Sequence, residues 1–272
     1  MKRRGNHIRA VFGLELDISY PFPSAEGLSI ILGLIIFLTI MFQSVYYPFM
    51  ITESPFVNNL ELERVSEFIA APAFYILSGP YFDMMILFPI LLPLLCAFRV
   101  AGPFENGVLK SVLTHPIRRS GLLVVKGLQI LLLTCLPVTL GSFVGITLFN
   151  GLLLGLESAL AITSFWTLGF MILSLSFLVS VATRSSAKAA FGGVGLSTAL
   201  FVIATLSKLP ATIRGVANPL NLTVSYFQGF APFGNSIDGL VFGDVIVSVL
   251  GSLTVGVLAF LLSIKLFKEA EI

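Results

Sequence analysis

Six continuous apolar runs, each close to the length that a helix needs to cross a bilayer, divide the sequence. About 20 residues of helix span the hydrocarbon core, whereas an outer-membrane barrel would show many short segments of alternating polarity. Composition agrees with helical spans, since 56% of the residues are hydrophobic and 11% are charged. The sequence therefore predicts an all-α integral membrane protein. Its six expected spans cover residues 28–46, 81–98, 122–149, 160–182, 189–206 and 245–266.

Basic residues are distributed unevenly between the two sides that six spans define. Thirteen of the 16 Lys and Arg residues fall on the side that holds both termini, and only Arg64, Lys208 and Arg214 fall on the other. Because Lys and Arg concentrate in cytoplasmic loops, we expect a plasma or inner membrane protein with both termini in the cytoplasm. The net charge of +2 reflects this topology. No basic cluster is interleaved with aromatic residues, so no nucleic-acid partner is expected.

Short surface helices are expected outside the spans. Residues 1–27 form a cytoplasmic N-terminus with apolar residues at helical spacing, which favours an interfacial helix; a disordered basic tail is the alternative. No apolar core follows the basic start until residue 28, which argues against a cleaved signal peptide. Residues 28–266 are the six-span domain, and 267–272 are a cytoplasmic tail. Gly, Pro and Asn in the apolar segment 209–243 favour short external or re-entrant helices between spans five and six.

The sequence carries no recognisable catalytic machinery. It contains neither a G-x-x-x-x-G-K-[ST] nucleotide loop nor a metal-ligand cluster, and Cys96 and Cys135 fall inside expected spans. Asp83 and Asp244 could form a carboxylate pair, but both are expected at outer helix ends, where a carboxylate complements the helix dipole. No ionisable residue falls at mid-depth in a span, as ion-coupled carriers usually require. We therefore expect no enzymatic activity, no cofactor and no metal, and an energy source outside this chain.

A polar segment, residues 103–120, separates spans two and three. Pro103 suits the first turn of a helix, and Glu105 places a negative charge near the positive end of its dipole. The apolar residues of this helix form one stripe: Val108, Leu109, Val112 and Leu113. Pro116 ends the pattern. The segment therefore predicts a short cytoplasmic amphipathic helix, and a helix resting on the membrane surface is the alternative.

This segment resembles the E-x-G-T-L-x-x-L-L-[ST]-x-P-[VI]-[ST]-R-x-x-L-L-x-G-K signature of type-2 ABC exporter permeases, including the branch of the nitrous-oxide reductase maturation permease. The matching residues are Glu105, Gly107, Leu109, Val112, Leu113, Thr114, Pro116, Arg119, Leu122, Leu123 and Lys126. The chain departs from the signature at Val108, Arg118 and Val125. Six spans, an N-terminal interfacial helix and a broken segment between spans five and six extend the resemblance along the chain.

The resemblance implies a coupling helix that docks on a separate ATP-hydrolysing subunit. The docking residues would be Glu105, Gly107, Leu109, Val112, Leu113, Pro116 and Arg119. It also implies an ATP-driven exporter in which two ATPase subunits serve this permease and a second copy or a paralogous permease, with the substrate pathway formed by the dimer within membrane lipid. The alternative from another class is a non-transporting membrane scaffold or assembly factor that holds a cytoplasmic partner.

Overall fold

The structure is a computed structural model. It describes residues 24–53, 72–107, 119–150, 156–206, 208–228 and 240–269. Within these ranges the regular structure is helical, without a strand, which confirms the predicted all-α class. The expected N-terminal interfacial helix lies outside the described residues, as does the greater part of the expected coupling helix.

Each of the six expected spans corresponds to a long helix. These helices are α2 (Ser24–Glu53), α4 (Pro72–Cys96), α7 (Arg119–Asn150), α8 (Leu156–Thr183), α9 (Ser186–Thr205) and α12 (Phe242–Glu269). Among the described residues, five helices are long and apolar enough to cross a membrane, and α2 carries a shorter apolar stretch, Gly27–Phe42. Two short helices, α10 (Ala211–Ala217) and α11 (Pro219–Gln228), follow α9, as the segment 209–243 predicts.

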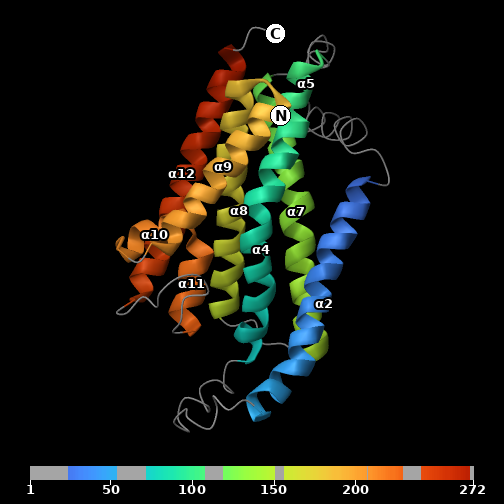
Figure 1. The fold of residues 1–272 in the computed structure, drawn as a ribbon, viewed down its shortest axis with the longest axis vertical. Helices are drawn as coiled ribbons and strands as arrows, with labels where there is room; N and C mark the ends of the chain where they lie inside the picture. Colours follow the sequence, from blue (N-terminus) through green and yellow to red (C-terminus); the bar gives the residue numbers. More distant parts are fainter. Residues whose placement is uncertain are drawn as a thin grey trace, which may run out of the picture.

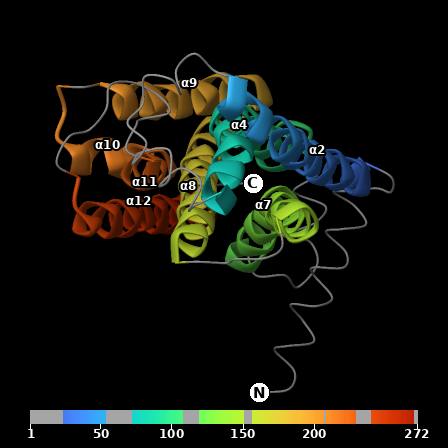
Figure 2. The same ribbon diagram turned by 90° about the horizontal axis from the view of Figure 1, so that it is seen from below.

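Helix α8 is the centre of the bundle. It packs against α4, α9, α11 and α12, while α2 pairs with α7 on the other side (Figures 1 and 2). Its large side chains, among them Phe165, Ile172 and Phe177, are buried, and several of its hydroxyls return to the helix backbone. Ser174, for example, donates to the carbonyl of Phe170 at 2.7 Å. A helix that is apolar on all sides and bonds several of its hydroxyls to its own backbone suits this central position.

Helix α12 presents a row of small residues to the bundle. Its buried residues are Val245, Ser248, Ser252, Gly256, Ala259, Ser263 and Phe267. A Cβ atom at Gly256 would lie 2.9 Å from a ring carbon of Phe170, so α12 and α8 are in close contact. The Ser252 hydroxyl donates to the carbonyl of Val216 in α10 at 2.6 Å. Small residues allow close helix packing in a membrane, where lipid removes the usual hydrophobic driving force.

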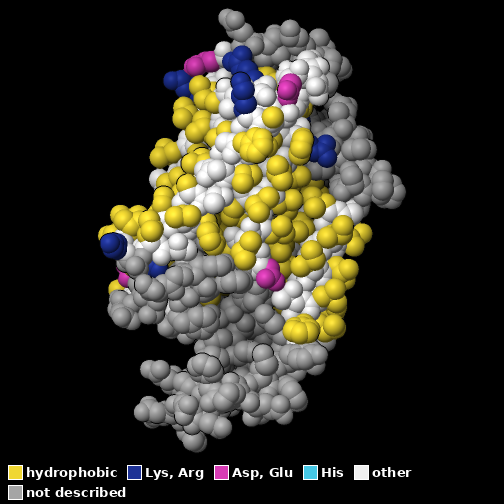
Figure 3. Space-filling model, in the orientation of Figure 1, with side chains coloured by type: hydrophobic (Ala, Val, Ile, Leu, Met, Phe, Trp, Pro, Cys, Tyr) yellow, Lys and Arg dark blue, Asp and Glu magenta, His cyan; other side chains and the backbone are white. Residues whose placement is uncertain are grey.

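The outer surfaces of α2, α7, α9 and α12 are strongly apolar. Leu148 is 66% exposed, Phe191 83% and Leu258 62%. Figure 3 shows hydrophobic side chains over the middle of one face, with most charged side chains toward the end of the bundle where α5 lies. Such a belt matches the hydrocarbon layer of a bilayer.

Candidate functional site

The candidate site begins where α4 ends. Helix α4 continues into η2 (Ala97–Ala101), a π-helical turn, and then into α5 (Gly102–Glu105). Ala97 and Ala101 are fully buried and form a cluster with Ala189 of α9. Three methyl groups at the contact let η2 and α9 approach closely. Single π-turns inside helices are rare and are frequent at functional sites.

Helix α5 contains the start of the predicted coupling segment. Pro103 lies in its first turn, as predicted, and the N–H of Asn106 returns to the carbonyl of Gly102 at 2.9 Å. Gly107 has a φ of +69°, a left-handed conformation that favours glycine. Helix α5 therefore ends at Glu105, and residues 108–118, where the sequence pattern places the rest of the coupling helix, lie outside the described residues.

Glu105 caps a different helix from the one expected. Its carboxylate accepts hydrogen bonds from the backbone N–H of Ser186, at 2.8 Å, and from the Ser186 hydroxyl. Ser186 is the first residue of α9, and the N-cap residue Ser185 makes no side-chain capping bond. The first N–H groups of a helix lack partners within it and carry partial positive charge. Glu105 thus supplies the missing acceptor from another segment.

The electrostatics follow from this contact. Glu105 is exposed, beyond the apolar part of α4, and the two hydrogen bonds from Ser186 lower the pKa of its carboxyl below the usual value. Arg184, in the turn that precedes Ser186, has a φ of +52°, which is uncommon for a residue other than glycine. The sharp α8–α9 turn therefore points the start of α9 at Glu105.

Phe104 connects the same segment to the last helix. Its ring meets that of Phe267 in an edge-to-face arrangement, with centroids 5.5 Å apart. Phe267 is 2% exposed and lies in the last turns of α12. Edge-to-face aromatic pairs contribute about 0.5–1.5 kcal/mol beyond their buried area. Helix α5 is thus attached to α9 through Glu105 and to α12 through Phe104.

The other predicted docking residues are only partly visible in this arrangement. Leu109, Val112, Leu113 and Pro116 lie outside the described residues, and Arg119 is the first residue of α7. Gly107 forms the exposed turn after α5. Sequence reasoning missed Ser186 and Phe267, which are distant in the chain. A Ser-Ser pair before an apolar run is a helix-start signal, but nothing in it identifies Glu105 as the partner.

The carboxylates Asp83 and Asp244 do not form a site in this bundle. Helix α8 lies between α4, which carries Asp83, and α12, which carries Asp244 (Figure 2). Asp83 is not at a helix start as expected, because α4 begins at Pro72. Asp244 does act at a helix start, where it accepts the N–H of Val241 at 3.1 Å. The described residues contain no group of three His, Cys, Asp or Glu side chains that could hold a metal.

The fold and this junction define the class: a multi-pass helical membrane protein whose polar segment between two spans is joined to two further spans. The chain belongs to the ABC-2 family of transporter proteins, since the model for ABC-2 family transporter protein matches residues 25–272. It is therefore a membrane-spanning permease subunit of an ABC transporter, as its signature predicted. No curated protein sequence matches the chain.

Proposed function

We propose that this permease is an exporter subunit whose segment 103–120 docks on a separate ATPase subunit in the cytoplasm. Two copies, or this chain and a paralogous permease, enclose the substrate pathway. ATP binding and hydrolysis in the partner move the docked segment, and the spans transmit that movement to the opposite membrane face. ABC-2 permeases normally pair with an ABC ATPase, which supports the assignment of the partner.

The observation that carries the proposal is the double attachment of α5. Glu105 holds the start of α9 and Phe104 holds the end of α12, and both precede the docking residues by a few positions. A displacement of residues 108–118 would reach both helices through these contacts. Rigid elements joined in this way are the means by which a switch at one end of a bundle moves the other.

The dimer is supported by the shape of the single copy. Helix α8 is enclosed by its neighbours, while α2, α7, α9 and α12 expose rows of large apolar side chains. Two apolar pockets among the described residues lie at helix contacts near this surface. One copy therefore provides a wall, and a pathway needs a second wall.

Docking is tested with the double variant Leu109→Asp and Leu113→Asp. Burial of each leucine in the ATPase groove would contribute about 1.5 to 3 kcal/mol, and an unpaired buried carboxylate adds a large desolvation cost. The ATPase should therefore no longer co-purify with the detergent-extracted permease. Asn106→Asp is the matched control, since it adds a charge at an exposed position close by and should leave co-purification intact.

Recovery of the ATPase at the wild-type level by the double variant would show that this segment is not the docking element. The alternative function, a scaffold that never transports, makes a different prediction in the intact complex. A scaffold would co-purify with its partner through the same leucines, yet ATP hydrolysis in proteoliposomes would not respond to any transported compound. The scaffold would be excluded if a transported compound changes the rate of ATP hydrolysis in the wild type and in Asn106→Asp, but not in the Leu109→Asp and Leu113→Asp double variant.

A further inference from the structure

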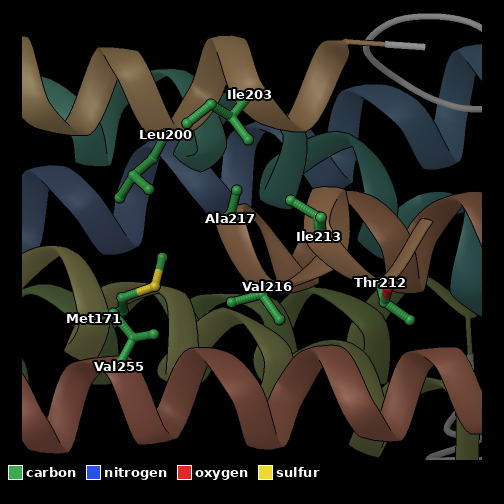
Figure 4. Close-up of a pocket in the computed structure, with 8 residues that line it drawn as sticks. All are labelled: Met171, Leu200, Ile203, Thr212, Ile213, Val216, Ala217 and Val255. Carbon is green, nitrogen blue, oxygen red and sulfur yellow. The ribbon is translucent and has the colours of Figure 1, made fainter. Parts of the chain in front are cut away.

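An apolar cavity of about 360 Å³ lies between α8, α9, α10 and α12. Figure 4 shows Leu200 and Ile203 pointing into it from α9, with Met171 and Val255 on the opposite side. Its lining consists of Met171, Leu200, Ile203, Thr212, Ile213, Val216, Ala217 and Val255. Thr212 supplies the one hydroxyl group among these eight side chains.

The cavity opens on the apolar outer surface. Ile213 and Val255, which line it, are 50% and 36% exposed. Val202 of α9 and Leu206, the residue after its end, are also exposed apolar side chains. Because the chain spans a membrane, the medium in contact with this surface is lipid acyl chain rather than water.

The walls of the cavity are fixed from behind. Arg214 is buried and donates through Nε to the carbonyl of Ala204 at 3.0 Å, which attaches α10 to the end of α9. The Ser252 hydroxyl bonds to Val216, which attaches α10 to α12. A Cβ atom at Gly251 would lie 2.5 Å from Val216, so α10 has no room to move toward α12 and close the cavity. The space is therefore preformed.

We propose that this cavity binds one acyl chain of a membrane phospholipid, inserted between α9 and α12 and against α10. An empty space would deprive the lining atoms of their van der Waals contacts. An ordered water needs two to four polar partners, and apolar cavities stay dry, so water does not suit a space with one hydroxyl. An acyl chain in the cavity touches four helices, whereas an acyl chain on the open surface touches one or two. Acyl chains therefore occupy the cavity in preference to the open surface.

A lysine near the end of α9 can attract the headgroup of this phospholipid. Lys208 is exposed in the connection between α9 and α10, four positions before Thr212. A phosphate of a phospholipid is attracted to such a cation near the membrane surface. The inference depends only on the membrane location of the chain and not on the direction of transport or on the ATPase partner.

The test uses the full chain in phosphatidylethanolamine nanodiscs that contain a phospholipid with a diazirine on one acyl chain. After illumination, peptides with Leu200, Ile203 and Ile213 should carry more adduct than the open α12 surface around Leu258. Val255→Phe fills the cavity from its exposed rim and should reduce that adduct about tenfold, the effect of losing burial of about two methylene groups. Leu258→Phe is the matched control, because Leu258 is 62% exposed on the same helix and should leave labelling unchanged.

Equal labelling of the cavity and the open surface would overturn the proposal, as would labelling that Val255→Phe leaves intact. If Val255→Phe does not yield folded protein, Ile213→Phe fills the cavity from the opposite rim and answers the same question. A photo-crosslinking benzophenone amino acid at position 213, in place of Ile213, distinguishes a lipid in the cavity from a second copy of the protein. Capture of phospholipid supports the proposal, and capture of a second copy of the chain instead of lipid would show that the cavity is a subunit interface.

Discussion

Gly193 of α9 lies against Pro93 of α4 so closely that a Cβ atom at position 193 would stand 2.8 Å from the Cβ of the proline. This contact is the first of a series between α9 and the antiparallel segment formed by α4, η2 and α5. Ala97 and Ala101 meet Ala189 one to two turns further on, and Glu105 then meets Ser186. Helices α4 and α9 are thus joined from within the apolar belt to the start of the docking segment, without a large side chain at the closest contacts.

Replacement of Gly193 by alanine should weaken this contact. The Pro93 Cβ is fixed to its backbone and cannot rotate away, so the helices must separate. Overpacking of this kind costs about 1–3 kcal/mol. We expect a lower unfolding temperature for the detergent-solubilised Gly193→Ala chain.

Gly195→Ala is the control for this experiment. It lies on the same helix with no atom within 4 Å of its Cβ position, and alanine is favoured over glycine in a helix by about 1 kcal/mol. Its unfolding temperature should stay equal or rise. Equal losses in the two variants would show that the Gly193–Pro93 contact does not limit stability.

The spans could be predicted because a bilayer imposes length and apolarity on every helix that crosses it. The first residue of each helix could not be predicted in this way, because a helix can extend beyond the hydrocarbon layer, where apolarity no longer marks it. Helix α4 begins at Pro72, before the apolar run, and Asp83 is therefore an interior residue. The contact of Gly193 with Pro93 could not be predicted either, because the sequence does not show which span lies next to span five. Sequence spacing alone likewise could not pair Glu105 with a residue 81 positions away.

Loss of the Glu105 carboxylate should expose the first turn of α9. In Glu105→Gln an amide replaces the charged acceptor, so the Ser186 N–H loses its charge-assisted hydrogen bond. Amide hydrogen exchange at Ser186 should become faster than in the wild type, while exchange in the middle of α8 stays unchanged. Glu269→Gln removes an exposed carboxylate in the last turn of α12 and serves as the control. Unchanged exchange at Ser186 in Glu105→Gln would mean that the contact does not protect α9.

The same contact should depend on pH. Its hydrogen bonds lower the pKa of Glu105 in the folded state. The stabilising contribution is therefore fully present above the ordinary glutamate pKa of about 4.3, and it is lost as the pH falls through the lower folded-state pKa. Protection of the Ser186 amide, corrected for intrinsic exchange, should stay constant from neutral pH to near that value and then decrease. Glu105→Gln should show no such decrease, and an identical profile in both proteins would assign the transition to another group.

Cysteine labelling can establish which end of the bundle faces the cytoplasm. Helix α9 has 20 residues, so it is about 30 Å long, the thickness of the hydrocarbon core. Lys188 lies in its first turn and Lys208 beyond its last, and both side chains are exposed. The native Cys96 and Cys135 are fully buried, which keeps background labelling low.

With 13 of the 16 basic residues on the side of Lys188, that side should be cytoplasmic. A membrane-impermeant maleimide added to intact cells should therefore label Lys208→Cys, and Lys188→Cys should react only after permeabilisation. The opposite pattern would place residues 103–120 outside the cell, because Glu105 contacts Ser186 at the same end of α9 as Lys188. That result would reverse the topology and remove the ATPase docking proposal with it.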